Sequence, residues 1–369
     1  MTKRRDRQST AGKVTLTVLV LVALVGAAAC RDSTSTTLAT DASGDQTSED
    51  AGAVEAQESG EEPAPTSTPT TLPATTIPAV LPQLAFDPTG SPVNGQTRGV
   101  LVFDEGWVSP VLSAVQGGHR IWTPCGVQAD ASGGTFVETV DVVIDPGHGG
   151  EIETGAVGVG GLREADLNLG VARRVADELR DAGLTVVLTR DSDIRLPIVT
   201  RAEIARALQP KLFLSIHFNG GSTTFSRTPG TEMFFQYGNS ESRRLAGLIY
   251  EEVFAKLSTY DTQWVALSDS GVIYRLNREN EDFYGVLRRT GDVTTVLIEY
   301  LYLSNPSEER LVSDYAVQHE LAIATRKAVV RFLETDDPGS GFKEPMFRGY
   351  GSSGTGGLGG CDDPLVQAP

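Results

Sequence analysis

From residue 140 to residue 334, short apolar runs alternate with longer segments in which apolar residues recur every three to four positions. Such alternation is typical of α/β proteins, in which helices cover the faces of a sheet. The strand-like runs cover residues 142–145, 185–189, 212–217, 231–236 and 294–299. We therefore predict an α/β domain over residues 140–334.

The segments between these runs carry a helical period. Apolar residues recur every four positions in two of them, as Leu167, Val171, Val175 and Leu179, and as Leu245, Ile249 and Val253. This spacing places them on one face of a helix. We expect the second helix to span residues 240–257 and a further long helix to span residues 315–333.

The first thirty residues read as an export signal. Basic residues precede an apolar run at 14–25, and three alanines at 27–29 precede Cys30. Small residues before a cysteine are similar to a bacterial lipoprotein signal, in which Cys30 would carry the lipid and anchor the protein to the membrane. Simple cleavage after Ala29 and an uncleaved membrane anchor are the alternatives. Each predicts an exported protein in the cell envelope, at the outer face of the membrane or in the cell wall.

Three further segments flank the α/β domain. Residues 31–83 contain nine acidic residues, one basic residue and no aromatic residue, so they cannot bury enough apolar area to fold, and we expect a disordered tether. Residues 84–139 contain short β-like runs broken by glycines, which predicts a small β segment with His119 in a surface loop. Residues 335–369 form a loop-like tail.

Charge and cysteine content restrict the partners and the compartment. The net charge of -17 argues against a nucleic-acid partner, which needs a basic face. We expect a monomer. Once Cys30 is taken by lipid or lost with the signal, Cys125 and Cys361 remain as an even pair in an oxidising compartment. We predict a disulfide between them.

Two histidines and one glutamate stand where ligand sites collect in open α/β sheets. His148 and His217 end two of the strand-like runs, and Glu164 begins the first helical pattern. Zinc takes imidazole nitrogen and carboxylate oxygen, and a set of three protein ligands leaves a fourth position for water. The leading hypothesis is a catalytic Zn²⁺ site at these residues.

Five ordered motifs across residues 140–333 resemble those of the zinc-dependent N-acetylmuramoyl-L-alanine amidases. They are Asp-Pro-Gly-His-Gly-Gly at 145–150, Arg-Glu-Ala-Asp-Leu-Asn-Leu at 163–169, Thr-Arg-Asp at 189–191, Ser-Ile-His-Phe-Asn at 215–219, and Leu-Ile-Glu at 297–299 followed by Leu-Ser-Asn-Pro at 303–306. The resemblance implies zinc ligands at His148, Glu164 and His217 and a catalytic carboxylate at Glu299. It also implies a twisted, mostly parallel or mixed sheet of about six strands flanked by helices.

The substrate that the resemblance implies is peptidoglycan. The bond would be the amide between N-acetylmuramic acid and the L-alanine of the stem peptide. Glu299 would take a proton from the attacking water and pass it to the leaving amine. Asp145 or Asn219 would orient the ligands from behind, and the residues alone do not choose between them. Asn219 and Arg288 are candidate substrate contacts, although Arg288 is equally explained as a solvated arginine.

Two other functions remain open at this point. A cell-wall-binding lipoprotein would use the same cleft without hydrolysis, and a zinc carboxypeptidase would act on the same stem peptides. The presence of all four proposed site residues argues against the first, and the order of the motifs argues against the second. Some relatives block their zinc with an inserted acidic helix. Residues 237–293 offer one convincing helix, at 240–257, so we do not expect such restraint here.

Overall fold

The chain divides into two units, residues 1–74 and 75–369. The computed structural model describes residues 98–344 and 360–369, all of them in the second unit. The predicted export signal, Cys30 and the tether lie outside the described residues. Among the residues described, no helix is both long and apolar enough to span a membrane.

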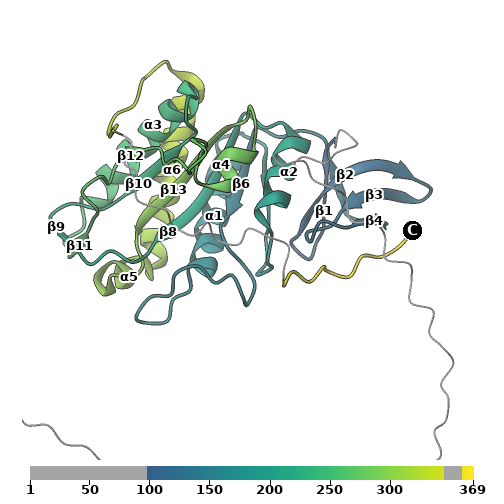
Figure 1. Cartoon of the computed structure of the whole chain (residues 1–369), viewed down its shortest axis with the longest axis horizontal. Coiled ribbons are helices and arrows are strands. Elements are labelled where there is room, and N and C mark those ends of the chain that lie inside the picture. The colour runs from purple at the N-terminus through teal and green to yellow at the C-terminus, as the bar shows by residue number, and fades with distance from the viewer. Residues whose placement is uncertain (1–97, 345–359) are drawn as a thin grey trace, which may run out of the picture. The chain divides into compact units, whose positions relative to one another are not determined.

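A mixed sheet of six strands forms the centre of the described part of the chain (Figure 1). Its spatial order is β12 (Val272–Ile273), β10 (Glu232–Phe235), β13 (Thr294–Tyr302), β8 (Leu212–Asn219), β6 (Val142–Pro146) and β7 (Val186–Leu188). Strands β7, β6, β8 and β13 run parallel to one another, whereas β10 is antiparallel to β13 and parallel to β12. The carboxyl ends of the four parallel strands therefore meet at one edge.

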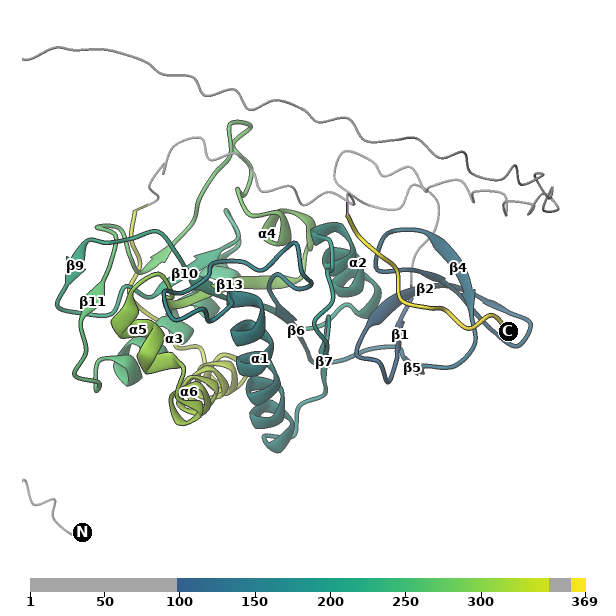
Figure 2. The same cartoon turned by 90° about the horizontal axis from the view of Figure 1, so that it is seen from below.

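Helices cover both faces of this sheet, as Figure 2 shows. One face packs against α1 (Glu164–Asp181), α3 (Ser240–Leu257) and α6 (Tyr315–Glu334). The other packs against α2 (Ile198–Leu208) and α4 (Gly285–Arg289). Helix α5 (Pro306–Val312) follows β13 directly. The prediction of an α/β fold with about six strands in a mixed sheet flanked by helices is confirmed.

The helical period seen in the sequence explains how α1 packs. Leu167, Val171, Val175 and Leu179 are each at most 2% exposed and form one apolar stripe against the sheet. The helix ends at Asp181, and Gly183 adopts a left-handed backbone with φ of 86°. Glycine adopts this conformation without the strain that a side chain would add, so the chain turns sharply toward β7.

Several elements differ from the sequence prediction. The apolar patterns do not predict α2, α4 or the two-residue strands β9 (Phe225–Ser226) and β11 (Trp264–Val265), which pair with each other, and they do not predict β12. In agreement with the sequence analysis, residues 258–284 contain no helix. His119 does not lie in a loop: it is on a strand of the small sheet, where its ring stacks at 5.5 Å from that of Phe136.

A second sheet precedes the α/β domain. Its five antiparallel strands stand in the order β4 (Gln128–Ala131), β3 (Gly118–Trp122), β2 (Val108–Val115), β1 (Val100–Val102) and β5 (Thr135–Val137). Val100 and Val108 join the apolar cluster that contains Ile204 and Leu208 of α2. The small sheet is therefore packed directly onto α2.

The carboxyl-terminal residues return to this small sheet. Cys361 forms a disulfide with Cys125, and the Cα atoms of the two residues lie 5.6 Å apart. Asp363 accepts hydrogen bonds from the hydroxyl of Thr123 and the backbone N–H of Cys125, both at 2.8 Å. Figure 2 shows this terminal segment running beside β4.

Removal of the disulfide is expected to lower the stability of the protein while the catalytic domain remains folded. Because the crosslink closes a loop of 236 residues, Cys125→Ser and Cys361→Ser should each lower the free energy of unfolding by about 2–4 kcal/mol. Urea titration of both single variants and the double variant would measure this. If peptide mapping of the natural protein without reductant found two free thiols, the pairing would be wrong.

Candidate metal centre and active site

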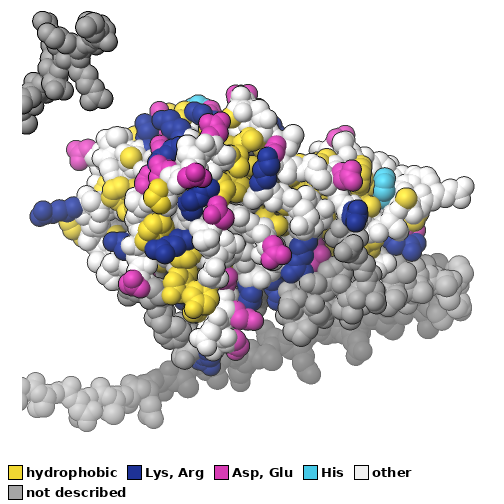
Figure 3. Space-filling view, turned by 90° about the horizontal axis from the view of Figure 1, so that it is seen from above, with side chains coloured by type: hydrophobic (Ala, Val, Ile, Leu, Met, Phe, Trp, Pro, Cys, Tyr) yellow, Lys and Arg dark blue, Asp and Glu magenta, His cyan; other side chains and the backbone are white. Residues whose placement is uncertain are grey.

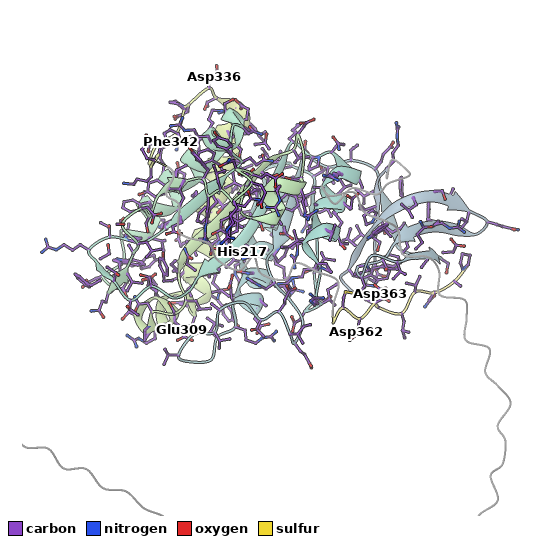
Figure 4. All side chains as sticks on the ribbon, viewed as in Figure 1. His217, Glu309, Asp336, Phe342, Asp362 and Asp363 are labelled. Carbon is purple, nitrogen blue, oxygen red and sulfur yellow. A yellow bond between two sulfur atoms is a disulfide. The ribbon has the colours of Figure 1, made fainter. Side chains whose placement is uncertain are left out.

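His148, Glu164 and His217 converge on one point at the carboxyl edge of the sheet, where Figure 4 labels His217. The Glu164 Oε1 atom lies 3.2 Å from the Nε2 of His148 and 3.0 Å from the Nδ1 of His217. Metal bonds of the usual length in a tetrahedral zinc site would place ligand atoms roughly 3.3–3.6 Å apart. The two measured separations are slightly shorter than this range, and all three ligand atoms lie within 4.8 Å of one another, so the group could hold a single metal ion.

The surface of the site is open on the His148 side. The His148 side chain is 32% exposed, whereas that of His217 is 15% and that of Glu164 is 5% exposed. A catalytic metal needs three protein ligands and one position open to water and substrate. His148 is the most exposed of the three side chains, so water and substrate would approach a bound metal from its side.

Glu164 is the first residue of α1, and the protein fixes both of its carboxylate oxygens. Oε2 accepts a hydrogen bond of 2.7 Å from the backbone N–H of Ala156. Oε1 accepts one of 3.2 Å from the N–H of Phe218 and a longer one of 3.4 Å from the amide of Asn168. Burial alone would raise the pKa of Glu164, but the hydrogen bonds from His148 and His217 hold it below its ordinary value.

The surroundings of His217 favour the neutral form of its imidazole ring. Burial lowers its pKa below the ordinary value, against the opposing hydrogen bond to Glu164. Its ring lies against Gly147, where a Cβ atom would come within 2.1 Å of the Cε1 of His217. Only glycine leaves room for the ring at this position, which explains the glycine before His148.

The turn that carries His148 is held from below by two buried arginines. His148 has a left-handed backbone with φ of 58°, which is unfavourable for a side-chain-bearing residue and needs outside support. Arg201 donates a hydrogen bond of 2.7 Å to the carbonyl of His148, and Arg190 donates one of 2.9 Å to the carbonyl of Gly147. Burial and the neighbouring charge of Arg201 lower the pKa of Arg190 to about 9.

Asp145 balances the charge of these arginines. Its Oδ1 lies 2.6 Å from the Nη1 of Arg201, and the hydroxyls of Thr189 and Ser215 donate to it at 2.6 and 2.8 Å. Burial by itself would raise the pKa of Asp145, but Arg201 and the two hydroxyls keep it below the ordinary value. Asp145 thus supports the backbone of the turn rather than a ligand side chain.

Glu299 stands beside His217 in the sheet. Position 299 of β13 is in parallel register with position 217 of β8, and it pairs on its other side with Glu232 of β10. Residues in register on neighbouring strands point to the same face and lie about 5 Å apart. A row of His217, Glu299 and Glu232 therefore crosses the carboxyl edge of the sheet, with Glu299 one strand away from a candidate metal ligand.

Asn219 and Arg288, the candidate substrate contacts, differ in their surroundings. The Asn219 amide donates at 2.9 Å to Glu232, a fully buried carboxylate that also accepts from Tyr302 and Ser270. Asn219 therefore belongs to the wall of the site. The guanidinium of Arg288 instead donates to the carbonyls of Asp282 and Phe283 and so closes the loop before α4.

The loops around the site are fastened to the junction of β13 and α5. Glu309, labelled in Figure 4, accepts hydrogen bonds from the N–H groups of Gly160 and Leu162, at 2.7 and 3.2 Å. The hydroxyl of Ser304 accepts one of 2.9 Å from the N–H of Gly221. Both loops are thereby tied to the segment that follows β13.

The sequence reasoning did not identify several supporting residues. The role of Asn168 could have been predicted, because it follows Glu164 by four positions and must share its helix face. Arg190 lies in the Thr-Arg-Asp motif at 189–191, although the motif does not reveal its role. Arg201 and Glu232 have no such signal, since charged residues are ordinarily expected at the surface. Their burial becomes visible only when β6, β7, β8 and β10 are assembled.

Comparison with known proteins gives consistent matches. The family description N-acetylmuramoyl-L-alanine amidase matches residues 142–331. N-acetylmuramoyl-L-alanine amidase AmiA of Escherichia coli (strain K12) is 31% identical over 237 residues, which cover 57% of this chain and 80% of AmiA. The uncharacterized protein YqiI of Bacillus subtilis (strain 168) is 35% identical over 203 residues, which cover 54% of this chain and 86% of YqiI.

A solved structure also matches. N-acetylmuramoyl-L-alanine amidase AmiC2 of Nostoc punctiforme is 29% identical, with a TM-score of 0.44. The match covers 52% of this chain and 96% of that chain.

The buried ion pair makes a prediction about stability. Arg201→Met should leave the Asp145 carboxylate without its buried countercharge and lower the free energy of unfolding by about 3–5 kcal/mol. It should also weaken metal retention, because the turn that carries His148 loses its support. Arg173→Met is the matched control, since Arg173 pairs with Asp191 at the surface. Equal urea midpoints for the two variants would contradict the proposed role of Arg201.

Proposed function

This chain belongs to the N-acetylmuramoyl-L-alanine amidase family, and from that premise we propose that it hydrolyses peptidoglycan with a zinc ion and a glutamate base. The bond cleaved is the amide that joins the lactyl group of N-acetylmuramic acid to the L-alanine of the stem peptide. The single observation that supports this most is the placement of Glu299 in register beside His217, at the edge where His148 and Glu164 also converge.

The residues divide into two groups by role. His148, Glu164 and His217 would hold zinc, which, when bound, polarises the scissile carbonyl and lowers the pKa of water. Glu299 takes a proton from the attacking water and delivers it to the departing alanine amine. Asn219, whose amide donates one hydrogen bond to Glu232, lies two residues beyond His217 and would donate its other N–H to the substrate.

The proposal extends to the location of the enzyme. We place it in the cell envelope, on peptidoglycan, with a membrane anchor through lipid on Cys30 and the monomer as the active form. Residues 31–83 would then act as a tether that allows the catalytic domain to reach the wall.

Product analysis tests the activity. Digestion of purified peptidoglycan should release free stem peptides and leave intact glycan strands, as mass spectrometry would show. Loss of terminal alanine would instead mean a carboxypeptidase, and unchanged peptidoglycan would mean a binding protein without hydrolysis.

His148→Ala and His217→Ala should lose bound zinc and activity together while most of the fold is retained.

The roles of the two glutamates can be separated. Glu299→Gln keeps the size of the side chain and removes the proton acceptor, so zinc content should remain near normal while the rate falls by roughly 100-fold or more. Glu164→Gln should instead weaken zinc retention, because a neutral amide is a poorer ligand than a carboxylate. Zinc stoichiometry and hydrolysis are measured side by side in both variants. If Glu299→Gln lost its metal and Glu164→Gln kept it, the two assignments would be reversed.

A further inference from the structure

A cavity of about 400 Å³ lies at the opposite end of β10 from the metal centre. Phe235, at this end of β10, pairs with Val296, whereas Glu232 at the other end pairs with Glu299. The residues that line it include Phe235, Tyr237, Asn239, Arg243, Tyr274 and Lys343. Figure 4 shows Phe342, the neighbour of Lys343, well apart from His217. The cavity is therefore not part of the catalytic site.

Aromatic rings form one wall of the cavity. The ring of Tyr274 lies 4.9 Å from that of Tyr237 and 5.5 Å from that of Phe235. Tyr237 is 53% exposed, so a face of this aromatic group is open to solvent. Rings of this kind pack against the C–H faces of sugars, while tyrosine hydroxyls and nearby polar groups bond to sugar hydroxyls. Asn239 also lines the cavity, where its Oδ1 accepts a hydrogen bond of 3.0 Å from the N–H of Ser242 and so caps α3.

The charges around the cavity favour an anion. Arg243 and Lys343 both line it, and neither forms an ion pair with any residue in the ranges 98–344 and 360–369. The guanidinium of Arg243 lies 4.2 Å from the ring centre of Phe342, which holds it in place without neutralising it. Glu344 is the single acidic residue in the lining. More generally, hydrophobic side chains and Lys and Arg side chains lie next to one another on the face of the molecule that Figure 3 shows.

The proposed reaction generates a ligand with this chemistry. Hydrolysis breaks the C–N bond of the lactyl amide: the oxygen of water joins the carbonyl carbon, and the nitrogen leaves as the amine of L-alanine. The glycan strand that remains carries a free lactyl carboxylate on each cleaved sugar. It thus combines the sugar rings and the negative charges that the aromatic wall and the two cations would recognise.

We propose that the cavity binds glycan strands whose lactyl carboxylates have been freed. This inference rests on the proposed function, because the amidase reaction produces such strands. Tyr237 follows Glu232 by five residues, a span of roughly 17 Å in extended chain. A strand held in the cavity would leave the metal centre accessible, so the enzyme would stay on wall that it has already cleaved while it acts on a neighbouring stem peptide.

Binding is measured with the full chain carrying Glu299→Gln, which slows hydrolysis of any amide that remains on the probes. The probes are glycan strands freed of peptides by an unrelated amidase, and the same strands with their carboxylates converted to methylamides. We expect the charged strands to bind about 10-fold more tightly than the methylamide strands, because two charge-assisted contacts are lost in the latter.

Variants separate the two parts of the cavity. Tyr237→Ala with Tyr274→Ala should abolish binding of both strands, whereas Arg243→Gln with Lys343→Gln should abolish only the preference for the charged strands. Tyr315→Ala is the matched control: Tyr315 is 72% exposed and begins α6, and should change nothing. If the double tyrosine variant is unstable by thermal unfolding, Tyr237→Ala alone replaces it, since that side chain is the more exposed of the two.

The outcomes distinguish this inference from the proposed function. Strand binding by the tyrosine variant equal to that of the Tyr315→Ala control would overturn the inference, and so would equal affinity of the parent for the charged and methylamide strands. Hydrolysis is followed separately on a soluble muropeptide, with Glu299 restored and the tyrosine substitutions present, where we expect the parent rate. If the parent enzyme bound the strands but hydrolysed no substrate, the proposed amidase activity would be wrong, whereas the proposal that the cavity binds glycan strands would be retained.

Discussion

The ion pair between Arg201 and Asp145, 2.6 Å long and almost wholly buried, is the interaction that supports the turn carrying His148, a candidate metal ligand. Burying either charge alone costs several kcal/mol, so the pair holds only if its remaining polar atoms are satisfied. The hydroxyls of Thr189 and Ser215 satisfy Asp145, and Arg201 donates to the carbonyl of His148. Strands β6 and β8, the residue that follows β7 and helix α2 are thus joined at one carboxylate, beneath the candidate metal ligand His148.

Sheet topology then brings the catalytic groups together. Because β6, β8 and β13 are parallel, their carboxyl ends meet at one edge. His148, His217 and Glu299 lie at these ends, although the three strands are distant in sequence. The strand β10 is antiparallel to β13, so its first residue, Glu232, lies at the same edge and extends the row formed by His217 and Glu299. An all-parallel sheet would place the beginning of that strand at the opposite edge and would leave Asn219 without the carboxylate that orients it.

The sequence predicts most of the fold class but little of the support beneath the site. A one-sided apolar stripe reveals α1, whereas α2 shows no such stripe because sheets pack on both its sides and bury even Arg201 and Glu203. A strand as short as β10 carries no indication of its direction. The partner of Asp145 lies 56 positions further along, and no local pattern connects the two. His148, Glu164 and His217 were foreseeable together because strand ends and helix starts are recognisable from the sequence.

The small amino-terminal sheet is bonded to α2, the helix that carries Arg201. The hydroxyl of Thr200 donates at 2.7 Å to the carbonyl of Pro124, and the backbone N–H of Gly99 donates at 2.9 Å to the carbonyl of Ala207. Pro124 precedes the disulfide-bonded Cys125, and Thr200 precedes Arg201. A continuous path of covalent and hydrogen bonds therefore leads from the crosslinked tail to the guanidinium under His148. The small sheet and its disulfide are thereby linked to the helix that carries Arg201.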